Sequence, residues 1–243
     1  MSHIDPREAI LEQSPLATAA VAWPRLPYRL PPARHAAAFA PSVSGWSGAA
    51  KRGFDIAFAV LALIIHIPLF VAAAVAIKLD SAGPILFRQR RIGLDGRSFE
   101  LLKFRTMQDR PSDQGLLCQT SPHDPRVTRI GALLRRTSID ELPQLWNVLR
   151  GDMSLVGPRP HAPGTCAGNT PFEQVSKHYA LRHRVRPGMT GLAQVRGWRG
   201  QTDTREKLLR RLDSDLEYIA TWSLGTDFLI LLRTVATLWR NAY

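Results

Sequence analysis

Residues 56–77 read IAFAVLALIIHIPLFVAAAVAI, and these 22 consecutive positions carry no formally charged side chain when His66 is taken as neutral. A helix of about 20 such residues can cross the hydrocarbon core of a bilayer. Basic residues flank both ends of the run, and basic residues favour the cytoplasmic side of a membrane. Pro68 lies near the middle, where it removes a backbone hydrogen bond. The sequence therefore predicts a helix that enters the membrane, breaks at Pro68 and returns to the same face.

The rest of the chain divides around this segment. Residues 1–49 are rich in proline and alanine, and we expect them to have little fixed structure. Residues 50–78 are the predicted re-entrant membrane helix, and residues 79–243 are the predicted cytoplasmic domain. The net charge of +12 suits an anionic partner, such as lipid headgroups, nucleotide phosphates or nucleic acid. The two cysteines, Cys118 and Cys166, do not indicate a disulfide framework and fit a reducing compartment.

The patterns after the membrane segment predict a mostly helical α+β domain that contains one β-hairpin. Apolar residues at 85–87 and 99–106 flank an Asp95-Gly96 turn, which is a strong hairpin signal. Helical spacing is found at residues 127–136, 142–149 and 208–219, and more weakly at residues 169–181.

The C-terminal stretch of residues 222–239 is apolar and aromatic but is interrupted by Asp227 and Arg233. An amphipathic helix in the membrane interface fits this pattern, with Trp222 and Trp239 at headgroup depth. A helix packed in the protein core is the alternative.

Residues 124–160 hold the densest set of residues that could carry chemistry. Asp140 and Glu141 precede Pro143, and a proline is tolerated in a helix only within the first turn. The carboxylates are therefore expected at a helix N-terminus, where ionised carboxylates and bound phosphate are both favoured. An ionised carboxylate can act as a nucleophile or hold a divalent cation. However, the S-x-x-E pattern of residues 138–141 equally fits a capping box, in which Glu141 only satisfies a backbone N–H.

Basic residues surround this pair along the chain. Arg135 and Arg136 lie upstream, and Arg159 lies between two prolines downstream. An arginine on such a stiff backbone suits a phosphate clamp, although an ordinary turn with an exposed arginine fits as well. A second basic stretch contains the turn of residues 186–191, RPGMTG, which could present Arg186 and backbone N–H groups to an anion.

Asp213-Ser214-Asp215 has the D-x-D spacing of some metal sites. These residues fall within the helical pattern of residues 208–219, where positions i and i+2 point about 200° apart. One cation could not easily take both carboxylates. Asp215 lies next to the apolar row and is the better candidate for a pocket residue.

Together these blocks resemble the bacterial sugar transferase family, the monotopic polyprenyl-phosphate phosphoglycosyl transferases that begin exopolysaccharide assembly. The resemblance covers about residues 50–243. It rests on KRGFD at 51–55, KFRTM at 103–107, the stretch 124–160 and RPGMTG at 186–191.

The resemblance implies transfer of a sugar-1-phosphate from a UDP-sugar to undecaprenyl phosphate, with Mg²⁺ and with release of UMP. Asp140 would be the nucleophile that forms a covalent phosphosugar intermediate, and Glu141 would help to hold Mg²⁺. The remaining residues implied for the phosphate and metal site are Lys103, Arg136, Arg159 and Asp215. The implied location is the cytoplasmic face of the bacterial inner membrane, in contact with its lipids and with no nucleic-acid partner. The resemblance does not settle whether the protein forms a homodimer.

The chain departs from the family at the membrane break, where Ile67-Pro68 replaces the Ser-Pro of many members. The hydroxyl that could satisfy freed backbone groups is therefore missing, and His66 is the candidate to replace it. Two rival functions are a glycosyltransferase that moves only the sugar and releases UDP, and a basic membrane scaffold without enzymatic activity. The sequence does not name the sugar.

Overall fold

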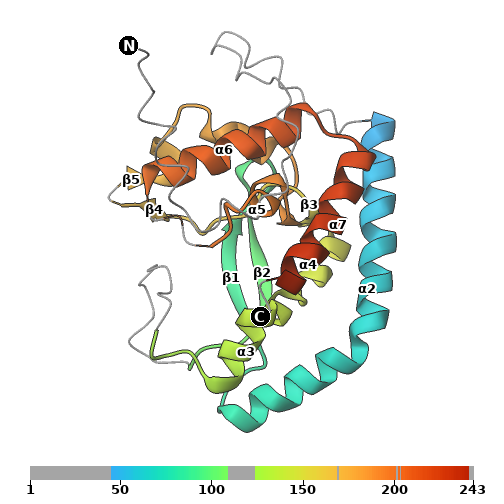
Figure 1. Cartoon of the computed structure of the whole chain (residues 1–243), viewed down its shortest axis with the longest axis vertical. Coiled ribbons are helices and arrows are strands. Elements are labelled where there is room, and N and C mark those ends of the chain that lie inside the picture. Colours follow the sequence, from blue (N-terminus) through green and yellow to red (C-terminus); the bar gives the residue numbers. More distant parts are fainter. Residues whose placement is uncertain (1–44, 109–123, 169, 201, 203, 241–243) are drawn as a thin grey trace, which may run out of the picture.

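The computed structural model describes residues 45–108, 124–168, 170–200, 202 and 204–240, and for residues 238–240 it describes the backbone only. The expected unstructured tail lies outside these residues, apart from positions 45–49, which are helical. The mostly helical α+β class is confirmed (Figure 1). The elements in chain order are α2 (Gly45–Asp80), β1 (Leu86–Ile92), η3 (Leu94–Gly96), β2 (Ser98–Phe104), α3 (Arg129–Thr137), η5 (Ile139–Glu141), α4 (Gln144–Arg150), β3 (Ser154–Val156), β4 (Cys166–Ala167), β5 (Thr170–Pro171), η6 (Phe172–Gln174), η7 (Tyr179–Arg184), β6 (Gly188–Thr190), α5 (Leu192–Val195), α6 (Arg205–Ala220) and α7 (Leu224–Arg240), where η marks a 3-10 turn.

The long apolar run forms α2, a helix of 36 residues that continues through Pro68. Figure 1 shows that the helix bends and does not stop. Pro68 removes the donor to the Ile64 carbonyl, whereas the His66 Nδ1 atom lies 2.8 Å from the Ala62 carbonyl oxygen. His66 therefore does not replace the missing bond, and the predicted break is a bend in a continuous helix.

α2 is exposed over most of its apolar surface. It is the one helix in the described part of the chain that is long and apolar enough to cross a membrane, and 11 % of its most apolar window is buried in the protein. Apolar side chains such as Ile64, Ile65 and Val71 are more than half exposed. This composition is compatible with membrane anchoring.

The bend lets α2 contact two separate cores. Before it, Ala59 packs into the main core with α4 and β3. After it, Ala73 and Ile77 pack against Phe104 and against Ile139, the residue before Asp140. The same helix that is exposed to the outside therefore also supports the turn that carries Asp140.

The predicted hairpin is confirmed. β1 pairs with β2 antiparallel, with Leu86 opposite Phe104 and Ile92 opposite Ser98. The connecting turn has positive φ at Asp95 (52°) and Gly96 (75°). Two successive left-handed residues match the right-handed twist of a tight hairpin, and Asp-Gly adopts them readily.

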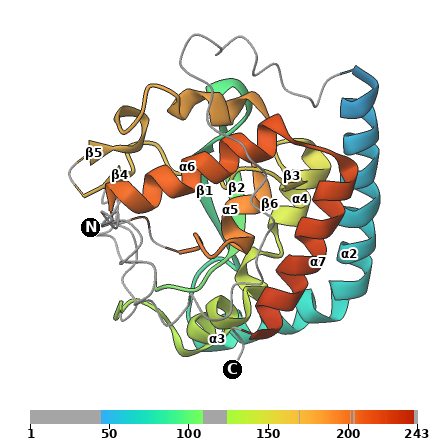
Figure 2. The same ribbon diagram turned by 45° about the horizontal axis from the view of Figure 1, so that its top comes forward.

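The two C-terminal helices differ in how they bury their apolar residues. Leu208, Leu212 and Ile219 of α6 are buried, as the spacing of residues 208–219 predicted. α7 lies beside α2 in both views (Figures 1 and 2), and it buries Ile230 while Phe228 remains half exposed. α7 thus combines the two expectations, since one face packs in the core and the other presents apolar side chains outward.

One expectation about the C-terminal half is corrected. Residues 169–181 do not form a helix; where described, they form the short strand β5 and 3-10 turns, because Pro171 is extended, with ψ of 142°. The Nε1 of Trp222 donates to the Asp227 carboxylate at 3.1 Å, and its expected position at headgroup depth stays a prediction. The side chain of Trp239 lies outside the described residues.

The segments after β3 and around β6 pack backbone against backbone. The Gly157 N–H donates to the Thr190 carbonyl at 2.9 Å, and the Gly188 N–H donates to the Pro158 carbonyl at 3.0 Å. A Cβ at Gly188 would overlap the Gly157 backbone, so no side chain fits between them. The turn of residues 186–191 was expected to present backbone N–H groups to an anion. The Gly188 N–H does not do so, because it is bonded to the Pro158 carbonyl.

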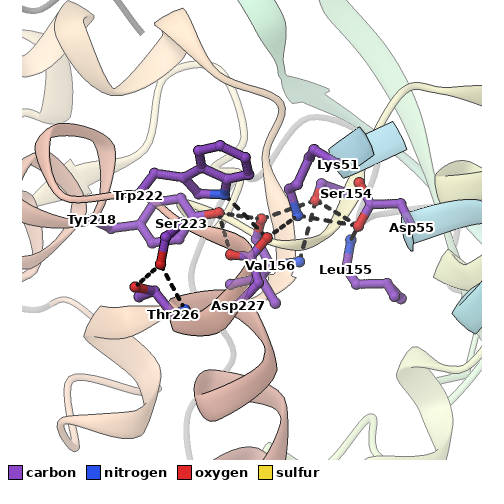
Figure 3. A network of polar contacts seen from close by, with 10 residues as sticks. All are labelled: Lys51, Asp55, Ser154, Leu155, Val156, Tyr218, Trp222, Ser223, Thr226 and Asp227. Atoms are coloured by element: carbon purple, nitrogen blue, oxygen red, sulfur yellow. Dashed lines mark hydrogen bonds and ion pairs between the residues drawn. The ribbon is translucent and has the colours of Figure 1, made fainter. Parts of the chain in front are cut away.

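A buried ionic network joins α2 to β3 and α7 (Figure 3). Lys51 Nζ lies 3.1 Å from Asp55 and 2.7 Å from Asp227, and all three side chains are less than a tenth exposed. Asp55 also accepts from the Ser154 hydroxyl and the Leu155 N–H, while Asp227 also accepts from Tyr218 and Trp222. The network we call the Lys51 network consists of Lys51, Asp55, Ser154, Leu155, Tyr218, Trp222 and Asp227.

Candidate functional site

Asp140 and Glu141 lie in η5, the 3-10 turn between α3 and α4. Ser138 ends α3 in the left-handed conformation, with φ of 60°, which is uncommon for a residue with a side chain. Its hydroxyl accepts a hydrogen bond from Arg199 at 2.5 Å and makes no capping bond. The capping-box interpretation is therefore wrong, because neither side chain of the motif caps the helix.

Glu141 is instead held by two cations from distant parts of the chain. Lys103 on β2 donates to Oε1 at 2.8 Å. Arg159, in the Pro-flanked segment after β3, donates to Oε2 at 3.1 Å and also to Oε1. Burial opposes ionisation, but Arg159 and Lys103 hold the pKa of Glu141 well below its usual range. Glu141 is thus a fully ionised and strongly paired carboxylate.

Asp140 has a different environment. It is 7 % exposed, and its closest cation is Lys103, whose Nζ lies 3.8 Å from Oδ2. No described residue donates a hydrogen bond to its carboxylate. Burial raises the pKa of Asp140, and the charge of Lys103 only partly opposes this shift. The environment pushes the pKa values of the two neighbouring carboxyl groups apart, a pattern that commonly separates catalytic roles.

The structure selects one of the two arginines at the end of α3. Arg135 acts electrostatically on Asp140, and its Nε donates to the Thr106 hydroxyl at 2.8 Å. Arg136 is exposed and contacts neither carboxylate. The sequence placed both arginines near the carboxylates and the family resemblance implied Arg136, whereas in the structure Arg135 is the one that acts on Asp140.

Arg186 lies at the other end of α4. Its Nε donates to the Gly151 carbonyl at 2.9 Å, and Arg52 of α2 donates to the carbonyls of Val148 and Leu149 nearby. Cations at a helix C-terminus stabilise its unpaired carbonyl groups. Among the described contacts, Arg186 therefore supports α4 and does not touch Asp140 or Glu141.

Asp215 is buried on α6 and is not brought to Glu141. Its Oδ2 accepts two hydrogen bonds from Arg182, at 3.0 and 2.7 Å. Arg182 had no individual role in the sequence prediction. The only signal was indirect: the position of Asp215 beside a buried row required some cation, because an unpaired buried charge is costly. The pattern could not say which cation.

Asp140 and Glu141 are the two carboxylates of η5 that could hold Mg²⁺. No group of three His, Cys, Asp or Glu side chains gathers anywhere in the described ranges. Protein-bound Mg²⁺ is often held by one or two carboxylates together with substrate phosphates. Asp140 and Glu141 provide such oxygen atoms, and Asp140 has no competing hydrogen bond. Glu141 is already paired with Lys103 and Arg159, and Asp215 is already paired with Arg182, so Mg²⁺ at either carboxylate would compete with these cations.

An apolar cavity of about 420 Å³ lies beside this turn. Pro143, in its wall, follows Glu141 by two positions, and Leu102, also in its wall, precedes Lys103. The other lining residues come from α2, β1 and α4, and they are Leu63, Phe70, Leu86, Arg88, Trp146 and Arg150. The cavity is therefore walled by α2, the hairpin and the start of α4, with two arginines among its walls, and neither Asp140 nor Glu141 lines it.

Comparison with known proteins places this arrangement in a family. The family model described as "Bacterial sugar transferase" matches residues 46–241. A protein of Komagataeibacter xylinus named "Undecaprenyl-phosphate glucose phosphotransferase" is 53 % identical over 193 residues, which are 79 % of this chain and 36 % of that protein. A protein of Escherichia coli K12 named "UDP-glucose:undecaprenyl-phosphate glucose-1-phosphate transferase" is 49 % identical over 193 residues, 79 % of this chain and 41 % of that protein.

A third relative is matched over nearly its whole length. The Rhizobium leguminosarum bv. phaseoli protein named "Exopolysaccharide production protein PSS" is 49 % identical over 187 residues, 77 % of this chain and 94 % of that protein. The match spans only about two fifths of the first two relatives. Since the family model covers more than half of this sequence, the chain belongs to the bacterial sugar transferase family.

Proposed function

We propose that this chain transfers glucose-1-phosphate, or a closely related sugar-1-phosphate, from a UDP-sugar to undecaprenyl phosphate as the first membrane step of exopolysaccharide synthesis. The names of the relatives support the substrates, and several of them specify glucose. The observation that carries the proposal is the contrast within η5. Asp140 is buried without a hydrogen bond, next to a Glu141 that Lys103 and Arg159 neutralise.

In the first step, an Oδ atom of Asp140 attacks the β-phosphorus of the UDP-sugar. A bond forms between Asp140 and the sugar phosphate as the bond from that phosphorus to the bridging oxygen breaks, and UMP leaves with the bond's electrons. Burial makes Asp140 more basic than an ordinary aspartate, which suits a nucleophile. At 4 Å and an effective dielectric constant of about 20, two like charges repel by about 4 kcal/mol. Lys103 and Arg135 offset this repulsion.

In the second step, an oxygen of the lipid phosphate attacks the phosphorus of the intermediate. The bond between Asp140 and phosphorus breaks, which restores the carboxylate and gives the lipid-linked diphosphate sugar. Mg²⁺, which Glu141 would hold, supplies further positive charge for the substrate phosphates when it is bound. Arg159 fixes the Glu141 carboxylate in both steps.

The membrane placement follows from the surfaces of α2 and α7. Both helices expose apolar side chains, and both ends of α2 carry lysine or arginine. We place them in the inner membrane with both ends of α2 on the cytoplasmic side, so that the bend forms the re-entrant turn. The apolar cavity lined by Pro143, Leu63 and Phe70 then receives the first isoprene units of the acceptor.

The decisive experiment measures the nucleotide released from UDP-glucose, UDP-galactose and their N-acetylated counterparts, with and without undecaprenyl phosphate. UMP release together with a radiolabelled sugar-phosphate trapped on the protein, and its loss in Asp140→Asn, supports the proposal. Release of UDP identifies the glycosyltransferase rival. Salt-sensitive binding to any polyanion, with no turnover and no effect of Asp140→Asn, identifies the scaffold.

Topology is tested separately with single cysteines. In a Cys118→Ser, Cys166→Ser background, Trp46→Cys and Asp95→Cys report the two sides of α2. Labelling of both by an impermeant reagent only after the cytoplasmic side is exposed supports the re-entrant placement. Labelling of the two cysteines from opposite sides would mean that α2 spans the membrane.

A further inference from the structure

The Asp215–Arg182 pair is among the most deeply buried ion pairs of the described residues. The Asp215 side chain is 2 % exposed and the Arg182 side chain is 3 % exposed. Removing both charges from water is costly, and a buried pair often stabilises a fold no better than apolar residues of the same size. The pair therefore calls for an explanation other than stability.

Arg182 has a second set of contacts that lead toward Glu141. Its NH2 group, which bonds to Asp215, also donates to the main-chain carbonyl of Arg159 at 2.7 Å. The prolines on either side of Arg159 limit the backbone at that point, and the Arg159 side chain holds Glu141 with two hydrogen bonds. A continuous series of charged contacts thus runs from α6 to η5.

The other side chains that form hydrogen bonds with Arg182 are neutral. The Tyr179 hydroxyl accepts from Arg182 NH1 at 2.9 Å, and His161 Nδ1 lies 3.3 Å from the same group. Burial and the charge of Arg182 lower the pKa of His161 to about 3, so His161 is neutral. Asp215 is therefore the group that neutralises Arg182 and orients its guanidinium.

We propose that Asp215 is a positioning residue: through Arg182 it fixes the main chain of Arg159, and so directs the Arg159 guanidinium to Glu141. The inference rests on the proposed function for the meaning of Glu141. It assigns Asp215 a place behind the site, where it touches neither substrate nor metal. Loss of Asp215 releases the Arg159 segment and leaves Glu141 with a less well-placed partner.

A double-mutant cycle tests this coupling. Asp215→Asn is expected to lower the rate of UMP release 10- to 100-fold with little change in KM for the UDP-sugar. In an Arg159→Ala background the same substitution is expected to have no further effect, because its route to the site is already gone. Equal fold-losses in both backgrounds would overturn the proposal. Restoration of the Asp215→Asn rate by higher Mg²⁺ would also overturn it, in favour of a metal ligand.

Glu217 provides a matched control on the same helix. It pairs with Arg196 at 2.7 Å and does not contact the Arg159 segment. Glu217→Gln is expected to leave the rate within twofold. Hydrogen exchange over residues 157–161 gives a readout independent of turnover: deuterium uptake should rise in Asp215→Asn and not in Glu217→Gln. Unchanged uptake in both would contradict the positioning role.

A second variant separates positioning from folding. The double substitution Asp215→Leu, Arg182→Met replaces the ion pair with apolar side chains of similar size. It is expected to keep the wild-type Tm and yet be as slow as Asp215→Asn; wild-type turnover in this variant would disprove the role of the pair. The proposed function fails on different results, namely UDP release by the wild type or turnover by Asp140→Asn.

Discussion

The η5 site and the Lys51 network both place a lysine between two buried carboxylates, but they satisfy them differently. In the Lys51 network (Figure 3), each carboxylate receives hydrogen bonds from at least two groups besides the lysine. In the η5 site, Glu141 takes the close contacts with Lys103 and Arg159, while Asp140 is left with Lys103 at 3.8 Å and no hydrogen bond. Both clusters contain carboxylates in a closed environment, so burial alone does not separate a structural role from a catalytic one. The clusters differ in how completely their carboxylates are hydrogen-bonded, and this difference points to the η5 site as the functional one.

The comparison also explains the locations of the two clusters. The Lys51 network joins α2, β3 and α7, and its bonds hold the apolar helices on the domain. The η5 site lies where the chain turns sharply at Ser138, on a segment supported by both α2 and β2. We therefore expect substitutions in the Lys51 network to lower stability and substitutions in the η5 site to lower turnover.

The largest expected effect comes from Asp140→Asn. UMP release should fall by roughly 10³-fold or more, because the nucleophile is lost. The Tm should not fall, since the amide replaces a desolvated carboxylate that has no hydrogen bond to lose. Nucleotide release and thermal unfolding, measured on the same preparation, check both parts. Near-normal turnover would disprove the covalent mechanism.

Asp227→Asn should lower stability and leave turnover nearly unchanged, which is the opposite of the result expected for Asp140→Asn. It leaves Lys51 with Asp55 as its only carboxylate in a closed environment, and we expect a loss of about 2–4 kcal/mol in the free energy of unfolding. Turnover per folded molecule should change little. Thr226→Ala, at the exposed edge of the same region, is the control and should cost less than about 0.5 kcal/mol. If Asp227→Asn and Thr226→Ala have the same free energy of unfolding, the Lys51 network does not stabilise the fold.

The pH dependence of turnover tests how Lys103 acts on Asp140. Turnover requires ionised Asp140, so the rate should fall as the pH drops through the pKa of Asp140, which burial has raised above the ordinary aspartate range. Lys103 lowers this pKa. Lys103→Met should therefore move the acidic limb of kcat to higher pH, in addition to reducing the rate. A limb that stays in place would mean that another group controls it.

Ser138→Gly should have the smallest effect. Glycine adopts a φ of 60° without steric cost, which offsets the loss of the hydroxyl bond to Arg199. The net change in stability should stay within about 1 kcal/mol, and turnover should stay within a few-fold. A large loss of turnover with an unchanged Tm would instead indicate that the hydroxyl acts in the reaction.

Local patterns predicted much of this molecule. The hairpin follows from the Asp95-Gly96 turn, α6 follows from its apolar spacing, and Pro143 correctly placed the carboxylates just before a helix. Long-range packing decided the remainder. Arg135 and Arg136 are adjacent and chemically identical, and only the docking of α3 determines which one faces Asp140, since neighbours on a helix point about 100° apart.

Other features had no local signal at all. The pairing of Arg182 with Asp215 joins residues 33 positions apart. The S-x-x-E pattern pointed to a cap because sequence could not reveal that Ser138 adopts a left-handed conformation. The behaviour of Pro68 was likewise settled by packing: contacts on both sides of the bend hold α2 as one helix.

The contact between Gly157 and Gly188 joins two segments that are distant in the sequence. Because no side chain lies between them, the backbone at Gly157 and Pro158 packs directly against β6. A side chain at position 188 would push these two segments apart, and with them the backbone that leads to Arg159.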